Sequence, residues 1–221
     1  MPKTIAIVFM GAVAAVSAGA AAETLHCPAH VPAALDPPSG TTLTAGMAAS
    51  GVQVYVCTAP ASAGGAPTWV LKAPLAVLSE GKETTATHFS GPAPAPPVAA
   101  KAPNAAATPP PASPAASAPA TAPTWEALDG SRLTGARVAS AAAPDGKSIP
   151  WLLLRSTSSV GPGLFGDVTW VQRLDTVGGA APAAGCDAGH LGAEVMVPYR
   201  ADYFFYHAGA AGSPLRRCAS N

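Results

Sequence analysis

Apolar residues in this chain gather in short runs that are rich in β-branched and aromatic types. The two densest runs outside the N-terminus are residues 151–154 and 168–171. Such runs, bounded by turn signals, are typical of β-strands. Residues 158–163 between them contain glycines and a proline, which end regular elements and predict an antiparallel hairpin with a long loop. Since apolar residues occur on both faces of 151–154, we expect this strand in the centre of a sandwich or barrel, covered on both sides.

The run 51–57 alternates strictly, which is the period of a strand. Its three valines fall on one face, while Gln53, Tyr55 and Cys57 fall on the other. Together with residues 41–44 it predicts a first hairpin. Further strands are expected at residues 68–71, 74–78, 84–89, 124–128, 132–140, 194–199 and 201–206. About ten short strands with almost no helical periodicity predict an all-β fold, an antiparallel sandwich or barrel.

Asp129 and Gly130 stand between two of these expected strands. An Asp-Gly pair in this position is a strong signal for a tight hairpin turn, in which both central residues adopt positive φ. We therefore expect the strands on either side to pair with each other.

The composition changes abruptly between residues 92 and 123, where nearly every residue is alanine or proline and none is aromatic. Such a segment lacks the apolar side chains that would offset its chain entropy, so the low-complexity stretch 93–122 is expected to be disordered or polyproline-like. A linker between two domains is the alternative. An insertion in a loop of one domain that spans residues 23–221 is the other interpretation of this stretch.

Charge excludes one class of function. The 221 residues carry a formal net charge of zero, and only 11% of them are charged. A chain without a basic field does not attract nucleic acid, so no nucleic-acid partner is expected.

The N-terminus has the layout of a secretory signal peptide. Lys3 precedes an apolar run at residues 5–16, and small residues end at Ala22. Cleavage after Ala22 would remove residues 1–22 and leave an exported protein, periplasmic or extracellular, without a transmembrane segment. The alternatives are an uncleaved membrane anchor, for which the run is short, and a lipid anchor on Cys27, for which the preceding residues are unsuitable.

Four cysteines remain after cleavage, and an oxidising compartment makes disulfides their expected use. Three pairings are open. Chain termini often lie close together, which favours Cys27 with Cys218 and leaves Cys57 with Cys186. No two cysteines are close enough in sequence for the usual zinc spacing.

Six motifs, in order, resemble a family of exported bacterial and fungal proteins called domain of unknown function 3455. They lie at residues 51–57, 88–92, 124–131, 149–154, 171–176 and 198–203. The resemblance covers residues 31–206 and implies no established activity. Family members run from the motif at 88–92 almost directly into 124–131, so the resemblance also implies that the Ala/Pro-rich stretch is an insertion.

A catalytic site is not indicated by any known motif, since the Gly-x-Ser-x-Gly elbow of many serine hydrolases and a Gly-rich nucleotide loop are absent from the sequence. His88 and Asp129, with Ser131 nearby, are the candidates for an acid/base pair. The competing interpretation has Asp129 serving its turn and the His88 ring bonded to backbone. The histidines are scattered, so we expect no metal and no cofactor; they are His26, His30, His88, His190 and His207.

The candidate ligand-binding residues are Gln53, Tyr55, Trp125 and Arg173, with Trp69 as a further one. Aromatic planes beside hydrogen-bonding groups suit sugars or peptides, although core packing explains the same residues. Arg173 also requires an acidic partner or water, and Glu126 or Asp175 would serve. We hypothesise a noncatalytic exported module that binds an envelope polymer or small ligand, or is structural in the envelope. A small hydrolase or isomerase using His88 and Asp129 is the alternative.

Overall fold

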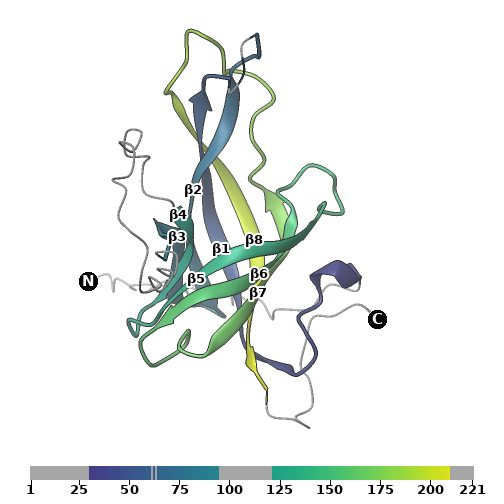
Figure 1. Ribbon diagram of the computed structural model, residues 1–221, viewed down its shortest axis with the longest axis vertical. Helices are drawn as coiled ribbons and strands as arrows, with labels where there is room; N and C mark the ends of the chain where they lie inside the picture. The colour runs from purple at the N-terminus through teal and green to yellow at the C-terminus, as the bar shows by residue number, and fades with distance from the viewer. Residues whose placement is uncertain (1–29, 61, 63, 95–120, 210–221) are drawn as a thin grey trace, which may run out of the picture.

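The computed structural model describes residues 30–60, 62, 64–94 and 121–209. A short 3-10 helix precedes eight strands, and each strand pairs antiparallel with the next until β8 closes the barrel on β1 (Figure 1). The elements are η1 Ala33–Leu35, β1 Thr41–Thr58, β2 Thr68–Glu80, β3 Glu83–Pro92, β4 Thr121–Ala127, β5 Arg132–Ala141, β6 Trp151–Val160, β7 Val168–Gly178 and β8 Glu194–Ala208. The predicted all-β class is confirmed, and the architecture is a barrel.

The expected hairpin between residues 41–44 and 51–57 is wrong, because β1 is one strand of 18 residues that pairs with β8 on one side and β2 on the other. Gly51 does not mark a turn. A Cβ atom at Gly51 would lie 2.1 Å from the carbonyl oxygen of Leu75 on β2, so the glycine permits a close approach of two backbones.

Two other expected breaks are also continuous strand. Residues 74–78 belong to β2, and residues 194–206 form one strand, β8. The proline in the middle of β8 interrupts the sequence pattern only, since the pairing of β8 with β1 continues through Pro198 opposite Val52. Figure 1 shows β1, β2 and β8 extending beyond the other strands as a long arm.

Apolar side chains form two separate cores. One fills the barrel, and its members include Met47, Trp125, Leu133, Phe165 and Phe205. The other lies outside the barrel, where the segment containing η1 lies against β5 and β6. It includes Val31, Leu35, Trp151, Leu153, Phe204 and Tyr206. The two cores explain why residues 151–154 are apolar on both faces, and the expected coverage of both sides is confirmed.

Gln172 ties the outer layer to the barrel. Its amide nitrogen donates a hydrogen bond to the carbonyl oxygen of Leu35 at 2.7 Å, and its amide oxygen accepts one from the Tyr206 hydroxyl. Gln172 is fully buried, and both ends of its amide are satisfied.

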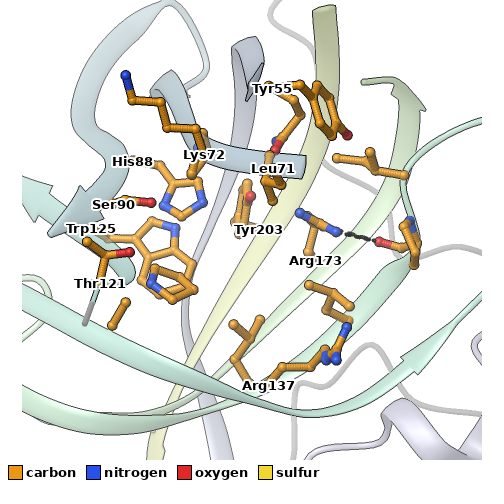
Figure 2. A pocket seen from close by; sticks show the side chains of 18 residues that line it. Tyr55, Leu71, Lys72, His88, Ser90, Thr121, Trp125, Arg137, Arg173 and Tyr203 are labelled. Atoms are coloured by element: carbon orange, nitrogen blue, oxygen red, sulfur yellow. Dashed lines mark hydrogen bonds between the residues drawn. The ribbon is translucent and has the colours of Figure 1, made fainter. Parts of the chain in front are cut away.

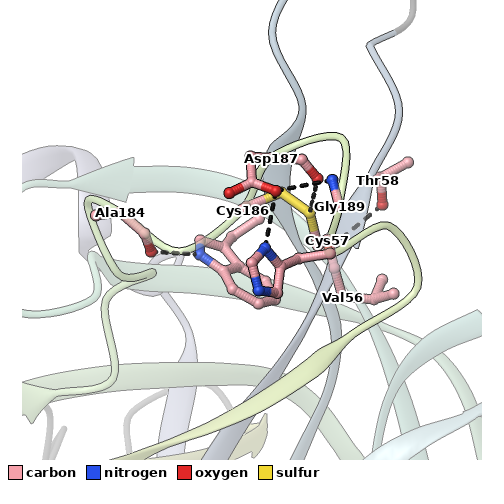
Figure 3. Close-up of a disulfide and its surroundings, with 9 residues drawn as sticks. Val56, Cys57, Thr58, Ala184, Cys186, Asp187 and Gly189 are labelled. Atoms are coloured by element: carbon pink, nitrogen blue, oxygen red, sulfur yellow. Dashed lines mark hydrogen bonds and ion pairs between the residues drawn. A yellow bond between two sulfur atoms is a disulfide. The ribbon is translucent and has the colours of Figure 1, made fainter.

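A disulfide holds the long loop between β7 and β8 against the end of β1. Cys57 and Cys186 are bonded, with an S–S distance of 2.01 Å and a Cα–Cα distance of 5.3 Å (Figure 3). The indole nitrogen of Trp69 on β2 donates to the carbonyl oxygen of Ala184 in the same loop. The predicted pairing of Cys57 with Cys186 is confirmed, whereas Cys27 and Cys218 lie outside the described residues.

The strands on either side of the Ala/Pro-rich stretch are neighbours in the barrel. β3 pairs with β4, with His88 opposite Trp125 and Pro92 opposite Thr121. The proposed insertion 93–122 extends too far, because Thr121 and Ala122 already belong to β4. Most of that stretch, like the predicted signal peptide 1–22, lies outside the described residues. Within the described ranges, no helix has the length and apolar character needed to cross a membrane.

The turn between β4 and β5 forms where the Asp-Gly pair predicted it, but with a different backbone. Gly130 has a φ of 84°, whereas Asp129 is not among the residues with positive φ. Asp129 instead accepts a hydrogen bond from the backbone N–H of Ser131 through its side chain. The expectation of positive φ at both positions is therefore wrong, because the carboxylate stabilises another turn geometry.

Candidate functional site

A cavity of about 400 Å³ lies inside the barrel, toward the end at which β4 and β6 begin (Figure 2). All eight strands contribute side chains to its wall. On β8 the inward-facing Tyr203 lines the cavity. Phe205, two residues later on the same face, packs in the apolar core, where the centroids of its ring and that of Phe165 are 4.8 Å apart. The cavity therefore occupies one part of an otherwise filled interior.

His88 on β3 lines this cavity and is 3% exposed. Its Nδ1 donates a hydrogen bond to the carbonyl oxygen of Thr124 at 2.8 Å, which leaves Nε2 of the neutral ring as an acceptor. The ring stacks on Trp125 with centroids 4.5 Å apart. The pKa of His88 is lowered from 6.5 to about 3, mainly by burial; the bond to Thr124 raises it in part, and the charge of Arg173 lowers it. The imidazole is therefore uncharged at neutral pH.

Three other polar side chains in the cavity wall have a buried atom without a partner. The Nε2 of Gln53, the Nε1 of Trp125 and the hydroxyl of Tyr203 make no hydrogen bond within the described part of the chain. The three residues are 1%, 0% and 1% exposed. A buried polar atom left unsatisfied costs about 1–3 kcal/mol, and such atoms are rare in folded proteins. All three atoms belong to residues that line the same cavity.

Three more buried polar atoms of the described residues lack a partner, and they belong to side chains that do not line the cavity: Thr42, Trp151 and Tyr199. Burial raises the pKa of Tyr199, and the nearby hydroxyl of Tyr203 raises it further. Neither hydroxyl makes a hydrogen bond of acceptable geometry to the other. Residues of the cavity wall thus carry three of the six unpartnered buried side-chain atoms found among the described residues.

Arg173 on β7 also lines the cavity, and its orientation is fixed by backbone. Nε and Nη2 donate to the carbonyl oxygen of Pro150 at 3.2 and 2.8 Å. A dashed line marks this contact of Arg173 in Figure 2. The suggestion that Glu126 pairs with Arg173 is wrong, because Glu126 pairs with Arg132 at 2.9 Å. Within the described residues, no ion pair joins Arg173 to a carboxylate.

Tyr55 on β1 lines the cavity with its hydroxyl already engaged. The hydroxyl donates to the carbonyl oxygen of Gly179 at 2.7 Å, and burial raises the pKa of Tyr55. Gly179 has a φ of 78°, and a Cβ atom there would lie 2.8 Å from that of Tyr199. The glycine allows the chain after β7 to cross close to the wall.

Asp129 and Ser131 do not line the cavity. Asp129 accepts hydrogen bonds from the Ser131 hydroxyl at 2.6 Å and from the backbone N–H of Leu164 at 2.8 Å, and the hydroxyl bond is the main reason that its pKa is lowered. The carboxylate thereby joins the β4–β5 turn to the loop after β6. No hydrogen bond connects it with His88 among the described residues, and both side chains bind backbone groups.

The structure brings together the four predicted ligand-binding residues Gln53, Tyr55, Trp125 and Arg173 in one cavity wall. Trp69 instead supports the loop that carries the disulfide. Sequence reasoning did not single out four other wall residues: Lys72, Ser90, Arg137 and Tyr203. The alternation within the aromatic run 203–206 could have suggested that Tyr203 and Phe205 share a face with each other and not with Phe204.

No metal-binding cluster is found among the described residues, where His, Cys, Asp and Glu side chains do not gather in groups of three or more. The wall of the cavity itself contains a single such residue, His88.

Comparison with known proteins gives one result. A family model described as protein of unknown function (DUF3455) matches residues 38–207. No curated protein and no solved structure matches the chain.

Proposed function

The chain belongs to the DUF3455 family of proteins of unknown function, and we propose that it is a noncatalytic exported module that binds a small ligand inside its barrel. The observation that carries the proposal is the set of unpartnered polar atoms on Gln53, Trp125 and Tyr203 around one cavity.

The size of the barrel suits this role. Eight strands enclose an interior that is either filled by side chains or holds one small ligand. The cavity of about 400 Å³ falls within the range of small-molecule pockets, and its wall combines many apolar groups with a few polar ones. Ordered water can satisfy isolated buried donors, but a wall to which every strand contributes favours a ligand that reaches several of them at once.

Export is supported by the layout of the N-terminus and by the disulfide between Cys57 and Cys186, since such bonds persist in oxidising compartments. The noncatalytic character is supported by His88, whose Nδ1 is bound to backbone and whose pKa near 3 leaves little basicity at neutral pH. The hydrolase or isomerase alternative gains no support from the contacts of Asp129.

Two buried glutamines test the proposal as a matched pair. Gln53 lines the cavity and has an unpartnered amide nitrogen, whereas Gln172 does not line it and has both ends of its amide bonded. Methionine has a similar length and no amide. In a thermal-shift screen of metabolites and soluble glycans, ligands should raise the melting temperature of the unmodified protein and of Gln172→Met, but not of Gln53→Met.

Without ligand the two variants should differ in the opposite way. Gln172→Met should lose about 1–3 kcal/mol of unfolding free energy because two partners are left unsatisfied, while Gln53→Met should lose nothing. Ligand binding that survives in Gln53→Met, or a screen in which no compound shifts the unmodified protein, would contradict the proposal.

A further inference from the structure

We infer that the ligand is an organic anion: an acidic head that faces Arg173 and Arg137, carried on an apolar body that fills the rest of the cavity. This inference rests on the proposed function, because it names the chemical class that the barrel would accept.

The first support is the charge of the wall. The chain contains equal numbers of basic and acidic residues, 12 of each, yet the cavity wall includes Lys72, Arg137 and Arg173 and no aspartate or glutamate. Lys72 is paired with Glu194. The other two cations form no ion pair with a carboxylate in the described part of the protein. The cavity of a neutral protein is therefore locally positive, which favours an anion where water is scarce.

The second support is the balance of donors and acceptors. The unpartnered nitrogens of Gln53 and Trp125 donate only, and each arginine adds further N–H groups. Nε2 of His88 is an acceptor, and the Tyr203 hydroxyl can act in either way. A wall with an excess of donors is satisfied by a ligand that presents acceptor oxygens, and ionised oxygens make the stronger bonds.

The third support is the orientation of Arg173. Its two bonds to Pro150 fix the guanidinium plane at the wall before any ligand arrives. A guanidinium has five N–H groups, and these bonds use two of them. The remaining N–H groups are available to a carboxylate without the entropy loss of ordering a free side chain.

The fourth support concerns the body of the ligand. Between the polar groups the wall is apolar, with leucines and prolines from β2, β4 and β6 such as Pro74, Pro123, Leu152 and Leu154. A sugar or an inorganic anion would leave this surface unused, whereas an aromatic or aliphatic body would bury apolar area against it.

The test uses two probes with the same apolar body, 2-naphthoate and 2-naphthamide, titrated calorimetrically into the mature protein with inorganic phosphate as a third arm. We expect 2-naphthoate to bind about 10- to 100-fold more tightly than the amide, as one or two charge-assisted bonds provide. Phosphate should bind at least 10-fold more weakly than 2-naphthoate, because it lacks the apolar body.

Three variants locate the effect. Arg173→Gln should reduce the preference for 2-naphthoate over 2-naphthamide to a few-fold. Arg137→Gln should reduce this preference in part. Because Arg137 is exposed, that variant tests the inference even if Arg173→Gln does not fold. Arg155→Gln removes the same charge from an exposed position of β6 that does not line the cavity, and it should leave the preference unchanged.

Equal affinity for the two naphthalene probes overturns the inference while binding inside the barrel stands. Equal losses in Arg155→Gln and Arg173→Gln also overturn it, because they would show a general effect of charge. If neither probe binds, the inference fails as well, and the metabolite screen then decides separately whether the barrel binds a ligand at all.

Discussion

Two halves of the same barrel interior differ sharply. The packed half, around Met47, Leu133, Phe165 and Phe205, is filled by apolar side chains in mutual contact. The cavity half contains Gln53, His88, Arg173 and Tyr203 around an open volume of about 400 Å³. Trp125 contacts both, with its ring stacked on His88 and edge-on to Phe205. The same strands and the same inward face supply both halves, so the backbone does not distinguish core from site.

The two halves differ in whether their buried polar atoms have hydrogen-bond partners. In the packed half, removing a side chain loses contacts that stabilise the fold. In the cavity half, unpartnered donors lower the stability of the protein without ligand, and that loss is recovered only when another molecule binds. Substitutions in the two halves should therefore change the free energy of unfolding in opposite directions.

Phe205→Ala should have the largest effect. The side chain is fully buried between Phe165 and Trp125, so its loss should lower the free energy of unfolding by about 3–5 kcal/mol. Urea denaturation followed by circular dichroism measures this, with the exposed Val177→Ala as control. A loss below about 1 kcal/mol would show that the packed half is not the stabilising one.

Replacing both Cys57 and Cys186 by alanine should lower the free energy of unfolding by about 2–4 kcal/mol, because the bond closes a loop with a sequence separation of 129 residues. The bond also holds the loop after Gly179, whose carbonyl accepts from Tyr55 in the cavity wall. The affinity for ligand should therefore fall in the double cysteine variant. It should not fall in folded Phe205→Ala protein. Unchanged affinity in the double cysteine variant would show that the loop does not support the cavity wall.

Acidification should destabilise the protein through His88. Its pKa is about 3 in the folded protein and 6.5 in the unfolded chain, so between these values the unfolded chain binds more protons. The free energy of unfolding then falls by as much as about 1.4 kcal/mol per pH unit as the pH drops from 6.5 toward 3, and the contribution is complete above pH 6.5. Denaturation of the unmodified protein, His88→Gln and the control His207→Gln across this window measures the slope, which should persist in His207→Gln. A slope of the same size in His88→Gln between pH 6.5 and about 5, above the range in which carboxylates titrate, would place the proton uptake elsewhere.

A pair of tyrosines should show the smallest effects and the clearest change of sign. Tyr203→Phe removes an unpartnered hydroxyl from the cavity half and should leave the free energy of unfolding unchanged or raise it by up to about 1 kcal/mol. Tyr206→Phe removes a hydroxyl that donates to Gln172 in the outer layer and should lower it by about 1 kcal/mol. Thermal denaturation of both variants compares them directly, and losses of equal size would contradict the distinction.

Several features followed from the sequence alone because they depend on near neighbours along the chain. The two-residue alternation of 51–57, the turn at Asp129-Gly130 and the apolar runs that became β6 and β7 are local signals. The same alternation placed Gln53 and Tyr55 on one face, where both line the cavity. Strand breaks predicted at Gly51 and before Pro198 were wrong. Pairing with strands distant in sequence keeps β1 and β8 continuous through these residues.

Only the tertiary structure decided which face is inside. A period of two divides a strand into two faces without saying which of them meets a core, and residues 151–154 proved to meet two. Closure of the sheet turned Gln53, Trp125, Arg173 and Tyr203, spread over about 150 positions of sequence, toward one volume. It also left their donors without partners, which is a property of three-dimensional surroundings and not of residue type: Gln53 and Gln172 are the same amino acid, and the barrel gives partners to both ends of one amide and leaves the nitrogen of the other unpaired.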